Sequence, residues 1–287
     1  MLLVLMWPAS VHCQTEELLW RFGFSRAIFS DRGENDTIAA LQAWTLMVLK
    51  DRQVVADTSF VLYDSPERMA RALDRNEIDT IVFQLIEYPQ LPADLICGPC
   101  FRTNVGGLAH KQFVLLTRRD GTISEFRDLS DKRVVFFDDE STALTELWLD
   151  AELAAAGFGP VAEVVSDIER GPSASSSVLG VFFGKFDACV VSRRIFDSMA
   201  ELNPQVAQQL EVLATSPWVL PSTFCFHSDY DEVQKERLLV EIERLNQTVA
   251  GQQVLNIFKA DGIARIDDEA LHRSIDLILS WQKAAER

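Results

Sequence analysis

The sequence is poor in positive charge. Its 27 Lys and Arg residues stand against 43 Asp and Glu residues, which gives a formal net charge of −16 at pH 7. No basic stripe is available to neutralise phosphates, so the composition argues against nucleic acid as a partner. It does not exclude a small anionic ligand, because local dipoles rather than net charge govern a closed pocket.

Catalytic and metal-binding motifs are also missing. The sequence contains no G-x-S-x-G, H-E-x-x-H, P-loop or G-x-G-x-x-G pattern. Its four histidines are scattered without the spacing of metal ligands. The sequence therefore predicts a protein that is not an enzyme and that uses neither a metal nor a cofactor.

Long apolar runs are absent beyond a short one at the N-terminus. Residues 1–7 are apolar, and residues 8–14 resemble the end of a secretory signal peptide, although the usual charged start is missing. We therefore expect residues 1–17 to be a signal peptide, cleaved between Cys13 and Glu17, and the mature protein to be periplasmic. A disordered or partly buried N-terminus is the alternative. No segment predicts a membrane span in the mature chain.

Cysteine is scarce, and four of the five cysteines follow the N-terminal segment. Cys97 and Cys100 form a C-x-x-C motif with the Gly-Pro pair that thioredoxins use. In thioredoxins the motif opens a helix, but residues 101–107 do not resemble a helix start. The pattern favours a structural disulfide or plain buried thiols. A thiol oxidoreductase acting through Cys97 and Cys100 is the less favoured alternative.

What the sequence does contain is an alternation of apolar strands and amphipathic helices. A chain of 287 residues with 48% hydrophobic content is long enough for two cores. The β-α-β rhythm predicts a largely parallel sheet covered on both faces, with a helix at 36–49 and a strand at 161–165. Irregular segments at 96–107 and 215–221 predict two crossings between lobes.

The two crossings divide the chain into two α/β lobes. Residues 18–104 and 218–287 are predicted to form a discontinuous lobe 1, and residues 105–217 to form lobe 2. The predicted fold class is therefore two doubly wound α/β lobes joined by a two-strand hinge.

Hydroxyl and cationic residues follow three predicted strands of lobe 2. They are Ser141 and Thr142, Ser175 and Ser176, and Ser192 and Arg193. Because the carboxyl ends of parallel strands share one crevice, we expect these residues to meet there. Helix N-termini expose unpaired N–H groups and arginine is a bidentate donor, so the set predicts a clamp for a polar or anionic ligand. In the alternative, the serines only cap helices and the arginine lies on the surface.

Acidic residues precede this clamp. Asp138, Asp139 and Glu140 come directly before Ser141. If they pointed inward they would repel a strongly anionic ligand, so they either face solvent or hold the amine of a zwitterion.

Lobe 1 offers residues for an opposing wall. Phe29, Asp36 and Tyr88 each lie just past a predicted strand, and an aromatic ring beside a polar group suits one side of a closing pocket. For Phe29, packing in the core is the alternative.

Several segments together resemble the phosphate/phosphite/phosphonate-type substrate-binding proteins of ABC transporters. The resemblance spans most of residues 20–265 and is carried by Asp128–Val134, Phe136–Thr142, Val178–Val191 and Ala214–Pro217. It implies a type 2 periplasmic binding protein fold with the ligand in a cleft between two lobes. Similar proteins hold a phosphonyl group on a Ser-Thr-Ser helix start, which here is Ser141-Thr142-Ala143, and a histidine common near the next helix start is absent.

The resemblance implies a monomeric protein that binds a small polar ligand, anionic or zwitterionic, and delivers it to an ABC permease. An alternative keeps the fold but makes the protein a sensor that presents its ligand-bound form to a membrane signalling protein.

Overall fold

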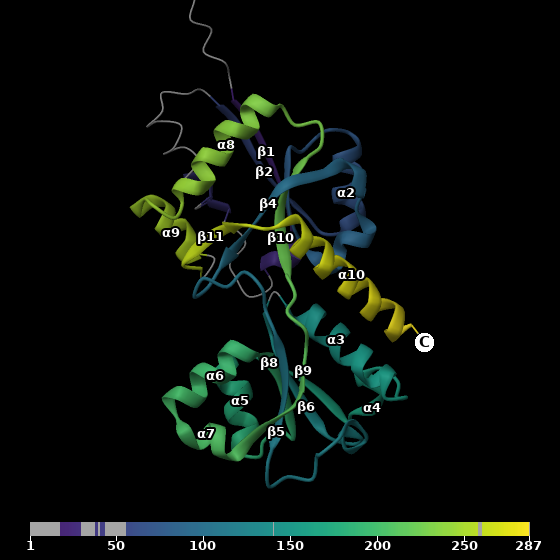
Figure 1. Ribbon diagram of the computed structural model, residues 1–287. Helices are drawn as coiled ribbons and strands as arrows, with labels where there is room; N and C mark the ends of the chain where they lie inside the picture. Colours follow the sequence, from purple (N-terminus) through teal and green to yellow (C-terminus); the bar gives the residue numbers. More distant parts are fainter. Residues whose placement is uncertain are drawn as a thin grey trace, which may run out of the picture.

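The computed structural model describes residues 18–29, 38–39, 41–43, 56–139, 141–257 and 260–286. Two α/β lobes lie one above the other in Figure 1, joined by two chain segments. The predicted signal peptide and most of the helix predicted at 36–49 lie outside the described residues; 38–39 and 41–43 within that helix are helical.

Lobe 1 is built on a six-stranded sheet with the order β11-β4-β10-β3-β1-β2. Its strands are β1 (Leu18–Ser25), β2 (Ala56–Tyr63), β3 (Thr80–Gln84), β4 (Ile96–Asn104), β10 (Ser222–His227) and β11 (Gly262–Arg265). Strand β1 is parallel to β2 and β3, whereas β10 and β4 run antiparallel to their neighbours. The sheet is therefore mixed, not largely parallel as predicted.

The prediction of an irregular crossing at 96–107 was wrong for most of its length. Residues 96–104 form β4, which pairs with β10 on one side and β11 on the other. The register against β10 shifts between Phe224 and Phe226, opposite the stretch that holds Gly98 and Pro99. Glycine and proline are tolerated within a strand at such a bulge, so these turn-forming residues do not end it.

Lobe 2 is built on a five-stranded sheet with the order β7-β6-β8-β5-β9. Its strands are β5 (Phe113–Arg118), β6 (Arg133–Phe137), β7 (Asp167–Gly171), β8 (Ala188–Ser192) and β9 (Leu210–Thr215). Strand β6 is parallel to β7 and β8, and β5 is antiparallel to β8 and β9.

The strand predicted at 161–165 was wrong. Residues Val161–Val164 form the short helix α4, which begins after Pro160 and whose first N–H group donates to the Asp150 carboxylate at 2.6 Å. The strand of this region is β7, an edge strand with largely exposed side chains. Its sequence lacks the apolar alternation by which a half-buried strand is recognised.

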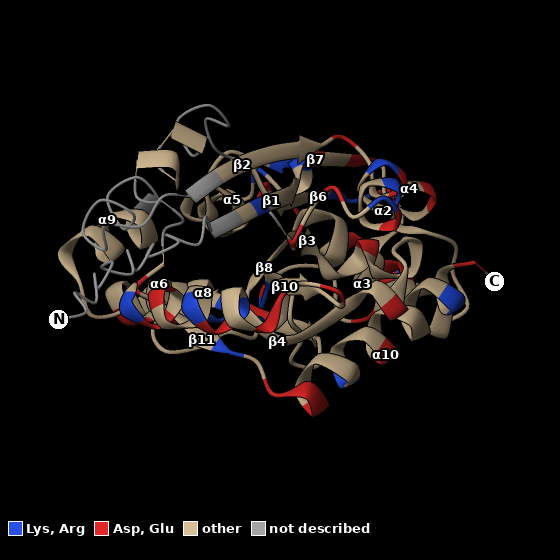
Figure 2. Ribbon diagram, turned by 90° about the horizontal axis from the view of Figure 1, so that it is seen from above, with Lys and Arg blue, Asp and Glu red and all other residues tan. Residues whose placement is uncertain are grey.

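Helices cover both sheets. The longer ones are α2 (Pro66–Asp74), α3 (Thr142–Ala155), α5 (Ala174–Phe182), α6 (Arg193–Leu202), α7 (Pro204–Gln209), α8 (Glu232–Arg244), α9 (Val249–Ile257) and α10 (Asp268–Ala285). Acidic and basic residues are interspersed along α8 (Figure 2). Within the described part of the chain, no helix combines the length and apolar character needed to cross a membrane.

The hinge consists of the segments between β4 and β5 and between β9 and β10. Lys111 and Val219 pair across it as an isolated antiparallel bridge, with N–H···O distances of 2.8 and 2.9 Å. Buried Arg102 ties both segments to lobe 1, because its guanidinium donates to Ala109 O at 2.8 Å and to Ser222 O at 3.3 Å. The exact lobe boundaries, 104/105 and 217/218, stay a prediction.

The C-terminal helix α10 extends from lobe 1 and packs against α3 of lobe 2 (Figure 1). Trp281 of α10 and Trp148 of α3 belong to one hydrophobic cluster, which also contains Leu220 of the hinge. The Ser274 hydroxyl accepts the Leu220 N–H at 3.1 Å. The apolar core is therefore continuous from lobe 1 to lobe 2 on the side of α10.

The C-x-x-C motif is not a redox pair. Cys100 forms a disulfide with Cys225, which joins β4 to β10, and Cys97 is a free thiol. Cys100 belongs to the cluster that contains α10, whereas Cys97 packs against the cluster beneath α8. Burial also raises the pKa of the Cys97 thiol, which opposes thiolate chemistry. These positions argue against a thiol oxidoreductase.

We predict that Cys225→Ala lowers the free energy of unfolding by about 2–5 kcal/mol, because the disulfide closes a long loop in the unfolded chain. Cys189→Ala, which removes a buried free thiol, should cost about 1 kcal/mol. Urea unfolding with and without dithiothreitol measures both. The reductant should destabilise the wild type and not Cys225→Ala; a wild type insensitive to it contradicts the disulfide.

We also predict that Trp281→Ala lowers the free energy of unfolding by about 3–5 kcal/mol, because it opens a cavity between the lobes. Leu279→Ala, on the same helix but with its side chain 41% exposed, should change it by about 0.5 kcal/mol or less. Equal effects of the two substitutions in urea titrations would mean that the α10–α3 contact is not a stabilising core.

Candidate functional site

Both sheets direct the carboxyl ends of their parallel strands to the hinge. In lobe 1 the last residue of β3, Gln84, pairs with Ser222, where β10 begins after the hinge. In lobe 2 the last residue of β8, Ser192, pairs with Phe113, where β5 begins after the hinge. Ligands of open α/β sheets bind at the carboxyl ends of strands. The candidate site therefore lies where these two edges meet the hinge.

The best-defined polar cluster of this edge surrounds the start of α3. The Lys111 ammonium group donates to Asp139 Oδ2 at 3.2 Å and to the Ser141 hydroxyl at 2.7 Å. Ser141 is only 1% exposed, and its hydroxyl makes no capping bond within α3. A buried hydroxyl and an ammonium group thus lie together at the positive end of a helix dipole.

Asp139 and Thr142 close the first turn of α3. Asp139 Oδ1 accepts the Ser141 N–H at 2.7 Å, and the Thr142 hydroxyl donates to Asp139 O at 2.7 Å. The Asp139 N–H donates back to Thr142 Oγ1 at 2.9 Å. The predicted clamp residues Ser141 and Thr142 are therefore bonded to neighbouring groups of the protein.

The other predicted residues of lobe 2 lie along the same edge of the sheet, after β7 and β8. Ser175 is exposed at the start of α5, and the Ser176 hydroxyl takes part in a capping box with Ser173. The Ser192 hydroxyl accepts the N–H of Ile195 in the first turn of α6. These contacts are those of helix caps, and a ligand-binding role for the three serines stays a prediction.

Arg193 is on the surface of α6. Its guanidinium pairs with Asp197, one turn along the helix, at 2.9 Å, and its N–H donates to Gln112 O in the hinge at 2.7 Å. The backbone of Arg193 therefore lies beside the hinge, whereas its guanidinium forms an exposed ion pair with Asp197.

Lobe 1 contributes a polar cluster at the ends of β1 and β3. Glu87 Oε1 accepts the hydroxyl of Ser25 at 2.7 Å, and Oε2 accepts the Gln84 N–H at 2.8 Å. Burial raises the pKa of the Glu87 carboxyl, and the two hydrogen bonds partly offset this effect. A carboxylate that is costly to ionise lies at this edge and would gain from a cationic partner.

The predicted aromatic wall of lobe 1 is partly core. Phe29 is buried and its ring packs against that of Phe24, which matches the alternative of core packing. Tyr88 lies in the short 3₁₀ helix η2 (Leu85–Gln90), half-buried, with its ring stacked on Phe83. Asp36 lies outside the described residues.

Sequence reasoning did not identify Lys111 as a site residue. It stands alone between two predicted elements, without a motif around it, and its role depends on the pairing with Val219 that places it beside α3. The available signal was a single cation between the crossing predicted at 96–107 and the strand that follows it.

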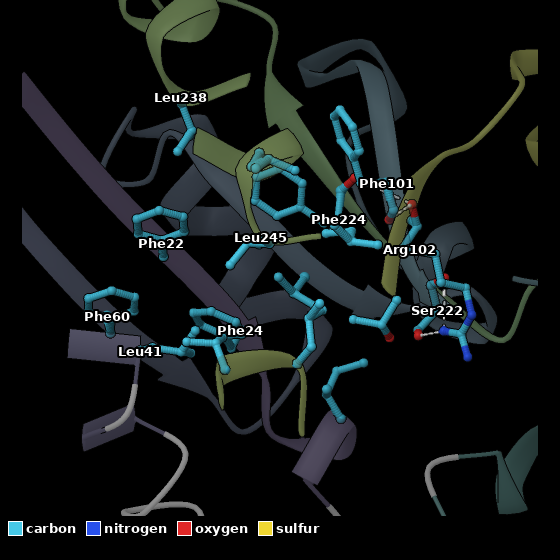
Figure 3. Close-up of a pocket in the computed structure, with 18 residues that line it drawn as sticks. Phe22, Phe24, Leu41, Phe60, Phe101, Arg102, Ser222, Phe224, Leu238 and Leu245 are labelled. Atoms are coloured by element: carbon cyan, nitrogen blue, oxygen red, sulfur yellow. Dashed lines mark hydrogen bonds between the residues drawn. The ribbon is translucent and has the colours of Figure 1, made fainter. Parts of the chain in front are cut away.

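A separate apolar cavity lies inside lobe 1, between the sheet and helices α8 and α9 (Figure 3). It has a volume of about 130 Å³, and its wall is almost entirely apolar, with rings such as Phe22, Phe60 and Phe224. Arg102 and Ser222 form a polar rim at one end (Figure 3). None of the sequence-predicted site residues that the structure describes lines it, and its wall offers few partners to a polar ligand.

Comparison with known proteins gives a family match across most of the chain. Residues 37–271 match the family described as "ABC transporter, phosphonate, periplasmic substrate-binding protein". No curated protein matches the sequence significantly.

Solved structures share the fold at low sequence identity. XAC2383 of Xanthomonas citri, bound to ATP, superposes with a TM-score of 0.64 at 15% identity, covering 94% of this chain and 99% of that one. PhnD1 of Prochlorococcus marinus, in complex with methylphosphonate, gives 0.57 at 14% identity, covering 93% and 99%. A phosphonate-transporter binding component from Pseudomonas aeruginosa gives 0.56 at 14%, covering 94% and 88%. These likenesses show the two-lobe fold.

The raised pKa of Glu87 predicts a pH dependence of stability. A carboxyl group that holds its proton more tightly when folded stabilises the protein below its ordinary pKa of 4.5 and loses that contribution as pH rises through the folded-state value. The unfolding free energy of the wild type relative to Glu87→Gln should therefore fall as the pH rises above 4.5.

Glu67 provides a control of opposite sign. Its pKa is lowered, chiefly by a hydrogen bond with Ser65, so the wild type should gain stability relative to Glu67→Gln as pH rises through this range. Urea titrations at a series of pH values measure both differences. A flat difference for Glu87→Gln would show that this carboxyl is solvated in the folded protein.

Proposed function

We propose a function that starts from the family, since this chain belongs to the phosphonate-type periplasmic substrate-binding proteins of ABC transporters. It is a ligand-binding transport component and not an enzyme. The proposal concerns what it binds and where. We infer a small ligand with a phosphonate-like anionic group, held between the lobes and delivered to a membrane permease.

The observation that carries this proposal is the cluster at the start of α3. Lys111, the buried hydroxyl of Ser141 and the N-terminus of the helix together supply a cation, a hydroxyl and oriented N–H groups. Charge-assisted hydrogen bonds of this kind suit a tetrahedral oxyanion. Thr142 adds a second hydroxyl once its bond to Asp139 opens.

Carboxylates on both lobes favour a ligand that also carries an amine. Glu87 lies at the end of β3, and Asp138 lies at the end of β6. An ammonium group between them would compensate the burial of the Glu87 carboxylate. An aminoalkylphosphonate therefore fits this edge better than a phosphonate without an amine.

Hinge closure is the proposed mechanism of capture. A ligand that contacts α3 in lobe 2 and the end of β3 in lobe 1 binds the closed arrangement more tightly than the open one and shifts the population toward it. The permease then distinguishes the loaded protein by the relative position of its lobes.

We predict that Ser141→Ala/Thr142→Ala abolishes most of the ligand-induced thermal shift. The probes are methylphosphonate, 2-aminoethylphosphonate and inorganic phosphate. Each protein hydroxyl that no longer bonds to a charged ligand should weaken the binding free energy by about 1.5–3 kcal/mol. Without ligand, the variant should lose about 1 kcal/mol of stability, because the hydrogen bonds of the two hydroxyls to Lys111 and Asp139 are lost.

Asn203→Ala is the matched control. Asn203 caps α7 in the same lobe by accepting the Gln205 N–H, away from the hinge edge. It should lower the melting point of the ligand-free protein to a similar extent and leave the ligand-induced shift intact. If both variants keep the full shift, Ser141 and Thr142 only support the helix and the ligand binds elsewhere.

A further inference from the structure

Asp139 occupies the donors that an incoming anion would use. Its Oδ2 accepts from the Lys111 ammonium group at 3.2 Å, and its Oδ1 accepts the Ser141 N–H at 2.7 Å. The same carboxylate thus neutralises the nearby cation and binds the first N–H of the α3 turn. The Asp139 carboxylate thus makes the contacts that the anionic group of a ligand would make at this place.

This carboxylate is able to leave its position. The side chain of Asp139 is 20% exposed and that of Lys111 is 24% exposed, so both groups border solvent. Two bonds of the turn do not involve the carboxylate: the Thr142 N–H donates to Asp139 O at 3.1 Å, and the Asp139 N–H donates to Thr142 Oγ1 at 2.9 Å. Rotation of the side chain therefore removes its carboxylate from the ammonium group and leaves these two bonds of the turn intact.

We propose that Asp139 is an internal competitor, whose carboxylate binds Lys111 and the Ser141 N–H in the empty protein and is displaced by the anionic group of the ligand. The inference rests on the proposed function and adds a residue that sets its affinity. Displacement costs the same free energy for every anion. It therefore lowers all affinities by one factor, and weakly bound anions fail to occupy the site.

A charge that stayed in place would act differently. A fixed Asp139 carboxylate would repel a dianion about twice as strongly as a monoanion, because Coulomb energy is proportional to ligand charge. Removing it would then favour the dianion. If Asp139 instead leaves the site on binding, removing it raises the affinities for the monoanion and the dianion by the same factor. Comparing the increase in affinity for the two ligands therefore separates the two mechanisms.

The chain contains a matched control for this test. Asp138 is adjacent and carries the same charge, but its Oδ1 accepts the Thr142 hydroxyl at 3.4 Å, whereas the ion pair with Lys111 is made by Asp139. Asp139→Asn keeps an oxygen for the Ser141 N–H and removes the negative charge that pairs with Lys111. Asp138→Asn makes the same change of net charge without removing the Asp139 carboxylate from Lys111, and probes without an amine do not engage the proposed role of Asp138 in binding an ammonium group.

The experiment titrates the wild type, Asp139→Asn and Asp138→Asn with methylphosphonate and methanesulfonate by calorimetry. The two probes share a tetrahedral shape, and at about pH 8.5 the phosphonate carries roughly one more negative charge. We expect Asp139→Asn to tighten the binding of both probes by the same factor, about tenfold, as for one charge-assisted bond. Asp138→Asn should produce a much smaller gain.

Three results would overturn the proposal, with folding of each variant checked by thermal unfolding. They are an unchanged or weakened affinity in Asp139→Asn, a gain no larger than that of Asp138→Asn, and a gain clearly larger for methylphosphonate than for methanesulfonate. If the folded wild type and Asp139→Asn bind neither probe, the phosphonate-like ligand class itself is wrong, and the inference with it. That outcome is distinct from binding with unaltered affinities.

Discussion

The pairing of Lys111 with Val219 determines how the rest of the molecule is arranged. Because both chain crossings meet at this antiparallel bridge, β5 and β10 start from the same place in opposite lobes. The parallel strands beside them then end facing the hinge, and every polar cluster of the candidate site follows from that direction. The Arg102 guanidinium of β4 donates to Ala109 O in one crossing and to Ser222 O at the end of the other, and so holds both against lobe 1. The bridge thus links the fold and the site through a few backbone hydrogen bonds.

The site itself is balanced between opposite charges. Lobe 2 offers the ammonium group of Lys111 beside the positive end of α3, and lobe 1 offers the Glu87 carboxylate, whose pKa is raised by burial. The net charge of −16 says little about this arrangement. In the proposed function, a zwitterion would place its anionic group beside Lys111 in exchange for Asp139 and its ammonium group beside Glu87, whereas a simple anion would do only the first.

Much of the fold was predictable from the sequence, because apolar periodicity reports burial directly. Strands were predicted before Ser141 and before Ser192, and a helix start at Ser141, and the structure has β6, β8 and α3 at these places. The two-lobe arrangement was predicted as well. Strand β4 was missed because its Gly-Pro pair sits in a bulge, and β7 because an exposed edge strand has little apolar pattern.

The candidate site was less accessible to such reasoning. Ser141 and Thr142 were identifiable because a helix start has a local signature, and the structure places both beside the hinge. Lys111 was not identifiable, since its partner Asp139 is 28 positions away along the chain and meets it only through the sheet. The disulfide pairing was not identifiable for the same reason, because Cys100 and Cys225 are separated by 125 positions along the chain.

The position of β10 between β3 and β4 also has a consequence for biosynthesis. The strands of lobe 2 all precede β10 in the chain, so before β10 is synthesised lobe 1 has β1, β2 and β3 on one side of the central position and only β4 on the other. Domains generally fold as their residues emerge. Lobe 1 contains the first strands of the chain to be synthesised, but its sheet can be completed only after lobe 2 has been synthesised. Until β10 is added, the facing edges of β3 and β4 can pair with other strands. Because β9 ends at the hinge and β10 begins there, a folded lobe 2 would hold the start of β10 close to its position between β3 and β4.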